Sequence, residues 1–148
     1  MVLETVRTYL SSIQEESDKQ VHLRATNTIR LHTLRALILK DTISSDQVRI
    51  YINRSRPIVN KMANEGRLLA IQDGRVLRFP RWQFDRKSES GLLPHLGEIL
   101  GVMDASPFRK AAWFVTKNPR LKDRTPLELL RTGEAQPVLE EARALVGS

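Results

Sequence analysis

The sequence from Ser44 to Asp85 reads SSDQVRIYINRSRPIVNKMANEGRLLAIQDGRVLRFPRWQFD, and it decides the fold expected for the chain. Its first part predicts a short helix, because Ser44 and Gln47 have capping-box spacing, in which each side chain bonds the other residue's backbone N–H. Ser55 marks the start of a second helix. Pro57 falls in the first turn of that helix, where the missing N–H of proline costs nothing.

A β-hairpin is expected directly after these two helices. Gly66 stands where the second helix needs a left-handed residue to end. Two apolar runs, residues 68–71 and 75–79, then flank the Gln-Asp-Gly sequence of residues 72–74. An Asp-Gly pair between two such runs is typical of a tight hairpin, because the turn requires positive φ angles. Helix, turn, helix and hairpin together predict a winged helix-turn-helix in a mainly α protein.

Three segments are expected along the 148 residues. N-terminal helices occupy residues 1–42, the winged helix-turn-helix occupies 43–87, and a separate helical domain occupies 91–148. The polar residues 86–91 serve as the linker. Trp82, just before the linker, is expected to pack the end of the wing onto its helices, with stacking on a base as the alternative.

The first 42 residues predict helix but leave its role open. Apolar residues share one heptad phase near the two ends of the segment, at Leu3, Val6, Leu10, Ile13, Leu31, Leu34 and Ile38. The same phase carries polar residues in the middle, at Ser17, Gln20, Arg24 and Asn27. One long coiled coil would bury that polar middle, so two helices broken near Ser17 are expected. They either pack on the chain's own core or form a dimerisation arm.

Positive charge is concentrated in one segment. The net charge is +7 and the pI is about 10.2. Lys and Arg number 6 against 5 Asp and Glu in residues 1–42, 10 against 4 in residues 43–87, and 8 against 8 in residues 88–148, so the differences are +1, +6 and 0. A basic excess that coincides with a helix-turn-helix pattern indicates a polyanionic partner, double-stranded DNA.

The second predicted helix, from Pro57 to Glu65, would lie in the major groove. Arginine is suited to guanine and asparagine to adenine, while a helix N-terminus suits phosphate and wing cations reach the backbone or the minor groove. The base-reading candidates are Arg56, Asn60 and Lys61, the phosphate candidates at the helix start are Arg54 and Ser55, and the wing candidates are Arg75 and Arg78.

A family resemblance covers some 40 residues of this stretch. The pattern lies in Ser55-Arg56, in Glu65-Gly66-Arg67-Leu68, and in Gly74-Arg75 through Phe79-Pro80. It resembles the DNA-binding domain of excisionases and MerR-type proteins, and it implies the same winged helix-turn-helix and DNA as the partner. Tyr51 and Asn53 stand where that family usually has alanine or glycine.

A second resemblance lies in the C-terminal segment. It rests on Trp113, Asn118-Pro119, Leu121, Thr125-Pro126, Glu128, Leu130 and Gly133. This spacing is similar to that in the toxin-binding domain of Xre/MbcA/ParS-type antitoxins. The DNA-binding part of that family is usually a Cro-like helix-turn-helix rather than an excisionase-like one. The resemblance implies a RES-domain toxin that consumes NAD as partner.

The partner surface is expected on Trp113 and on the last helix, from about Pro137 to Val146. In that helix the candidates are Leu139, Ala142 and Leu145. The alternative is that the last helix closes the core of its own domain, since its apolar residues suit either role.

The sequence contains no motif that is typical of a catalytic site. His22, His32 and His95 are scattered without ligand spacing, and Glu140 and Glu141 are adjacent, so they point in different directions on a helix. Phosphate loops, Gly-x-Ser-x-Gly and metal motifs do not occur, and the chain has no cysteine. A non-enzyme without cofactor or metal is therefore expected.

The sequence as a whole predicts a dimeric cytoplasmic regulator of transcription. No apolar run reaches the roughly 18–20 residues of a membrane span, and the first residues carry no basic signal-peptide region. An antitoxin that represses its own operon fits both resemblances. An excisionase-like DNA-bending protein, a regulator without a toxin, and a protein-interaction module that no longer binds DNA are the alternatives.

Overall fold

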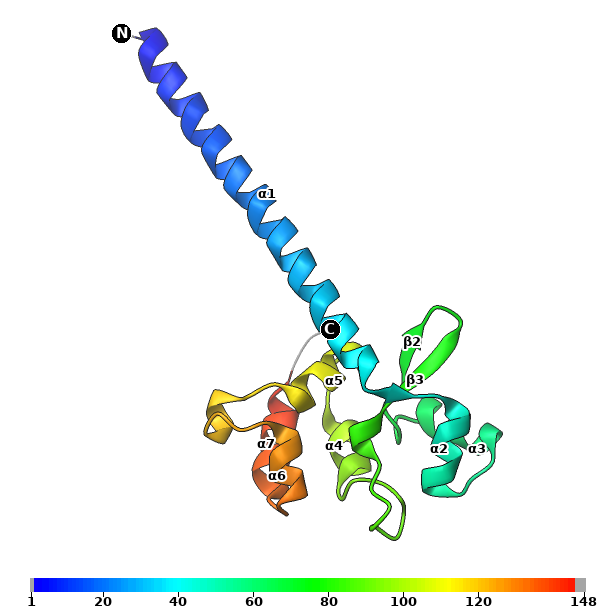
Figure 1. The fold of residues 1–148 in the computed structure, drawn as a ribbon. Helices are drawn as coiled ribbons and strands as arrows, with labels where there is room; N and C mark the ends of the chain where they lie inside the picture. The colour runs from blue at the N-terminus through cyan, green and yellow to red at the C-terminus, as the bar shows by residue number, and fades with distance from the viewer. Residues whose placement is uncertain (1, 146–148) are drawn as a thin grey trace. The chain divides into compact units, whose positions relative to one another are not determined.

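The computed structural model describes residues 2–145, and it describes side chains for residues 8, 10–15 and 17–145. The chain falls into two compact units, Met1–Ala36 and Leu37–Ser148. Over the described residues the protein is mainly helical, with a small three-stranded antiparallel sheet (Figure 1). The expected mainly α class is confirmed at that level.

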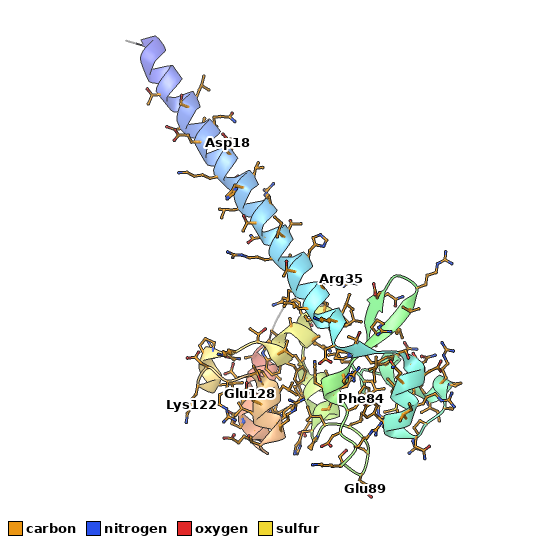
Figure 2. All side chains as sticks on the ribbon, in the orientation of Figure 1. Asp18, Arg35, Phe84, Glu89, Lys122 and Glu128 are labelled. Atoms are coloured by element: carbon orange, nitrogen blue, oxygen red, sulfur yellow. The ribbon has the colours of Figure 1, made fainter. Side chains whose placement is uncertain are left out.

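The N-terminal segment is one helix, α1, from Val2 to Lys40 (Figure 1). The predicted break near Ser17 is therefore wrong. No proline or glycine interrupts this segment, and its threonine hydroxyls bond carbonyls one turn earlier, as Thr26 does to His22 and Thr28 to Arg24. Within one chain the polar middle of α1 is exposed, and so it does not oppose a continuous helix (Figure 2).

Two short helices follow, α2 from Ser45 to Ile52 and α3 from Arg56 to Asn64. The capping box at α2 is confirmed: the Ser44 N–H donates to Gln47 Oε1 at 2.9 Å, and the Gln47 N–H donates to Ser44 Oγ at 3.2 Å. Asn53 ends α2 with a left-handed φ of 51°. This bend lets the chain reverse within three residues and begin α3.

The sheet comprises β1 (Thr42–Ile43), β2 (Ile71–Asp73) and β3 (Val76–Pro80) in the order β1-β3-β2. The expected hairpin is confirmed, since Asp73 pairs with Val76 and the loop is Gly74-Arg75, with Gly74 at a φ of 62°. Strand β1 gave no pattern in the sequence, because a two-residue strand has no periodicity. It pairs with the far edge of β3, placing Ile43 beside Phe79.

A hydrophobic core joins α2, α3 and the sheet. Its buried side chains belong to Ile43, Val48, Ile52, Val59, Met62, Leu68, Phe79 and Phe84. Each side chain of this size contributes about 1.5–3 kcal/mol when buried. The side chains on the exposed face of α3 lie outside this core, so that face is available for contact with another molecule.

The chain leaves the hairpin through a 3₁₀ turn, Arg81–Gln83. Gln83 in this turn is 0% exposed. Its Nε2 donates to the carbonyl oxygens of Leu69 and Pro80, at 2.8 and 3.1 Å, and its Oε1 accepts from the Leu69 N–H at 2.8 Å. Gln83 therefore fixes the chain after the hairpin to the chain before it.

Residues 86–91, expected as a linker, form a packed loop. The Ser88 hydroxyl lies 2.7 Å from the Leu92 carbonyl oxygen, and Gly91 is buried with a φ of 78° against the Tyr51 carbonyl. Tyr51 also stacks on Phe84 at 5.2 Å between ring centroids. Residues 37–148 form one compact unit, which includes both of the expected segments, 43–87 and 91–148.

The rest of this unit is helical. Its elements are α4 (Leu96–Val102), α5 (Pro107–Val115), a 3₁₀ turn (Pro119–Leu121), α6 (Pro126–Arg131) and α7 (Ala135–Ala144). Helix α6 begins with a side-chain cap, in which the Glu128 N–H donates to Thr125 Oγ1 at 3.1 Å. Trp82 is buried with its ring centroid 4.7 Å from that of Phe114 in α5. It therefore packs against a ring of the C-terminal segment, whereas the expected packing was onto the helices before the hairpin, and its buried ring is not an exposed stacking surface.

Candidate nucleic-acid interface

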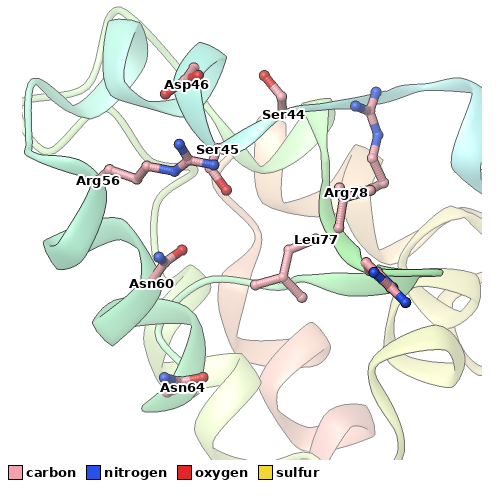
Figure 3. A pocket seen from close by; sticks show the side chains of 10 residues that line it. Ser44, Ser45, Asp46, Arg56, Asn60, Asn64, Leu77 and Arg78 are labelled. Carbon is pink, nitrogen blue, oxygen red and sulfur yellow. The ribbon is translucent and has the colours of Figure 1, made fainter.

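One face of α3 carries polar side chains at four-residue spacing. Arg56, Asn60 and Asn64 follow one another along the helix, with Leu77 and Arg78 of the hairpin opposite (Figure 3). Together with the start of α2 they line an open pocket of about 450 Å³. The four-residue spacing puts all three side chains on one side of the helix, because α-helices have 3.6 residues per turn.

Asn64 was missed as a site residue by the sequence reasoning. It lies one helical turn beyond Asn60, and it is exposed where Asn60 is half-buried. The signal was present in the sequence as the pattern Arg56-x-x-x-Asn60-x-x-x-Asn64.

The charge of this pocket is mostly positive. Arg56, Arg75 and Arg78 line it, against one carboxylate, that of Asp46 in the first turn of α2. Asp46 lies 4.0 Å from Arg49, so part of its charge is balanced outside the pocket. The pocket therefore favours an anionic or polar surface over a cationic one.

The N-terminus of α3 is open. Ser55 is the N-cap residue, but its side chain makes no capping hydrogen bond, and the first turn carries no acidic residue. The free N–H groups of such a terminus attract anions. Arg54 is exposed beside it, on a shallow pocket that it shares with Asp46 and Asn53.

Lys61 occupies a different face of α3 from the other predicted base readers. It lies outside the residues that line the pocket, and its ammonium group is 3.9 Å from the Glu65 carboxylate. Glu65 also lies 3.7 Å from Arg67. Lys61 therefore does not share the face of α3 that carries Arg56 and Asn60.

The two arginines of the hairpin differ in their surroundings. Arg75 is exposed in the loop of the hairpin. Arg78 is half-buried, and its guanidinium donates from Nε to Thr42 Oγ1 and from Nη2 to the Thr42 carbonyl oxygen, both at 3.1 Å. Arg78 thus has a structural role that the sequence reasoning did not anticipate.

The expected partner residues of the C-terminal segment are mostly inside the fold. Leu139 is 8% exposed and Ala142 is 0% exposed, while Leu145 and Trp113 are half-buried. Trp113 packs edge-on against Phe114, with 5.1 Å between ring centroids. The burial of Leu139 and Ala142 favours the alternative, in which α7 closes the core of its own segment, and contact of these residues with a partner stays a prediction.

The residues of the antitoxin-like pattern hold a set of turns. Asn118 Oδ1 accepts from the Arg120 N–H at 2.9 Å, and the Arg124 guanidinium lies 3.8 Å from Glu128 and 3.1 Å from Glu134. The Thr132 hydroxyl donates to Glu134 at 2.7 Å, and this bond, with the charge of Arg124, lowers the pKa of Glu134. Of the residues in these contacts, Asn118 and Glu128 belong to the antitoxin-like pattern, so part of that pattern supports a local structure.

Comparisons of the chain with protein families, with curated proteins and with solved structures found no match. Among the residues that the structure describes, no three or more His, Asp or Glu side chains are grouped as a metal site. Across the same residues, no helix is both long enough and apolar enough to span a membrane.

Proposed function

We propose that this protein is a sequence-specific DNA-binding protein of the winged helix-turn-helix type. In it α3 is the recognition helix, and the hairpin of β2 and β3 is the wing. The observation that carries this proposal is the row Arg56, Asn60 and Asn64, which faces the hairpin across an open, mostly positive pocket. The basic excess of residues 43–87 supports it independently.

The dimensions of α3 suit the major groove. With its side chains an α-helix is about 10–12 Å across, and the major groove is about 12 Å wide. The nine residues of α3 extend about 13 Å along the helix axis. Asn60 and Asn64 are separated by about 6 Å along the helix, close to two base steps of 3.4 Å each. Each asparagine that forms a bidentate pair with adenine would contribute roughly 1–3 kcal/mol of discrimination.

Phosphate contacts would surround this base-reading row. The open N-terminus of α3 with Arg54 and Ser55 would hold one phosphate, and Arg75 would reach the backbone or the minor groove from the wing. These contacts position the protein without reading sequence, and they make binding dependent on salt.

The test is selection of a preferred sequence from a random DNA library, followed by affinity measurement with variants. Asn60→Ala should cost roughly 1–3 kcal/mol on the selected site and leave non-specific affinity unchanged. Lys61→Ala is the matched control, because it changes the neighbouring residue on another face, and it should weaken both kinds of site alike. A library that yields no preferred sequence would contradict the proposal.

The finer proposal is an antitoxin that acts as a homodimer, binds a RES-type toxin and represses its own operon in the cytoplasm. It is supported by the likeness of residues 113–133 and by the ordered turns that those residues form. Trp113 is half-buried and remains the candidate contact. The test is co-purification with the RES-domain protein encoded next to it. A chain that binds DNA but no such protein would be a regulator without a toxin.

A further inference from the structure

Helix α1 presents apolar side chains to solvent. Leu10, Ile13 and Leu31 share one heptad phase, and they are 57%, 46% and 58% exposed. Val21 and Leu23, near the polar middle, are exposed to a similar degree. Long helices gain most of their stability from packing an apolar face, so this helix of about 58 Å is suited to a partner helix.

We propose that α1 pairs with the α1 of a second copy of this chain as an antiparallel coiled coil. The inference rests on the proposed homodimer, but it is independent of DNA binding. Three observations support it. They are the order of apolar and polar residues along the seam (the line of contact formed by the heptad phase of Leu10, Ile13 and Leu31), the side chains that flank the seam, and the distribution of charge.

In one antiparallel register, apolar residues of one helix face apolar residues of the other, and polar residues face polar residues. Leu10 then lies opposite Leu34 of the second copy, and Ile13 lies opposite Leu31. The polar layers in the middle would be Ser17 with Asn27 and Gln20 with Arg24. Moving the register by one heptad pairs apolar with polar side chains in either direction, Ile13 with Arg24 in one and Leu34 with Ser17 in the other.

Apolar side chains that flank the seam would cover its polar middle. In this register the two copies of Leu23 face each other across the two-fold axis, and so do the two copies of Val21. A parallel pair would place Leu23 opposite Thr28 and Val21 opposite Glu16. Only the antiparallel pair shields these exposed apolar side chains from water with each other.

Charge also favours the antiparallel direction. The antiparallel register brings Glu16 beside Arg30 twice, once on each side of the axis. A parallel pair would instead stack Arg24 on Arg24 and bring Arg30 beside Arg35. The like charges that the antiparallel register leaves, Arg7 and Arg35, lie near its ends, and Arg35 is already engaged within its own chain.

The seam ends at Leu34. The next residue in the phase, Ile38, is only 8% exposed and belongs to the compact unit that begins at Leu37. The pair would therefore use residues 10–34 of each copy.

Site-specific crosslinking tests this arrangement in the full chain, which has no cysteine of its own. Separate Leu10→Cys and Leu34→Cys proteins, one of them with a tag that shifts its mobility, are mixed and oxidised. The antiparallel register predicts a disulfide between the two variants and none within either alone, because the two copies of residue 10 lie about 36 Å apart along the axis. Ile29→Cys, on the outer face of the helix, is the matched control and should not crosslink.

Each outcome of the crosslinking experiment tests a different part of the proposal: the direction of the pair, its register, or the homodimer itself. Crosslinking of Leu10→Cys with itself would show a parallel pair and overturn the inference while the homodimer stands. A dimer by light scattering with no crosslink in the mixture would overturn the register and direction. A monomer by light scattering would overturn both the inference and the homodimer. Circular dichroism checks that each variant keeps its helix.

A charge exchange gives a second readout. Glu16→Arg should weaken dimerisation about tenfold at low salt, because it turns two attractive pairs into repulsive ones. Adding Arg30→Glu should restore the affinity to within about twofold of the starting protein. Failure of the second change to restore dimerisation would contradict the pairing of these two positions.

Discussion

The guanidinium of Arg78 on β3 is held by Thr42 on β1. Two hydrogen bonds, both 3.1 Å long, join residues that are 36 positions apart in the chain. The Thr42 hydroxyl in turn donates to the carbonyl oxygen of Leu39, in the last turn of α1, at 2.6 Å. Arg78 therefore ties the hairpin to β1, and its removal has a structural cost besides any loss of charge.

The two wing arginines should respond differently to alanine. Arg75→Ala should lower the slope of log K against log salt by about 1 and leave the melting temperature unchanged, because Arg75 is exposed. Arg78→Ala should lower the melting temperature and weaken binding to all sequences. Titrations at several salt concentrations, with thermal melts of the free proteins, separate the two effects. An unchanged melting temperature in Arg78→Ala would show that the Thr42 contact contributes little.

Gln83→Leu should destabilise the protein by roughly 2–4 kcal/mol. The substitution leaves the buried N–H and carbonyl of Leu69 without their partner, and each such group costs roughly 1–3 kcal/mol. Urea unfolding measures the difference. The exposed Gln136→Leu is the control and should change stability by no more than about 0.5 kcal/mol. Equal effects of the two variants would contradict this role of Gln83.

Gly91→Ala and Gly97→Ala should change stability in opposite directions. At Gly91 an added Cβ would meet the Tyr51 carbonyl at a positive φ, so a loss of more than about 1 kcal/mol is expected. At Gly97, in α4, an added Cβ meets nothing within 4 Å, so a gain of up to about 1 kcal/mol is expected. Denaturant midpoints of the two variants test this directly. Similar midpoints would mean that the 86–91 loop does not pack on α2.

Stability should depend on the ionisation of Glu134. Its pKa in the folded protein is lowered, so its contribution is present above the ordinary value of 4.5 and is lost as the pH falls through the folded pKa. Glu134→Gln should therefore flatten the fall of melting temperature with pH below about 4.5. Thr132→Val should produce part of the same change, because the Thr132 hydroxyl is the main cause of the shift. Parallel pH profiles for all three proteins would contradict it.

Local signals in the sequence predicted the elements around α3 well. The capping box at Ser44, the positive φ of Gly66 and the hairpin at Gly74 each depend on a few neighbouring residues, and the structure has all three. The three base-reading candidates were grouped without regard to helix phase, and the structure has Arg56 and Asn60 on one face and Lys61 on another. Their role on DNA stays a prediction.

Contacts between distant residues could not be read from the sequence. Thr42 looks like an ordinary loop residue until Arg78 is placed beside it, and Gln83 shows no pattern that marks it as buried. The loop at 86–91 has a linker's composition, but Gly91 packs on Tyr51. The unbroken α1 was missed because the heptad argument took the polar residues near its middle as a reason for a break, whereas a helix whose polar middle is exposed needs none.

The contact between Trp82 and Phe114 sets a limit on how this chain could be recombined. A gene fusion that joined a different C-terminal segment at residues 86–91 would keep Trp82 but lose Phe114, the ring against which Trp82 packs. A compatible exchange would have to carry both aromatic residues or replace both. The two tryptophans of the chain also flank the same phenylalanine, so the intrinsic fluorescence of the whole protein reports on this one place in the fold.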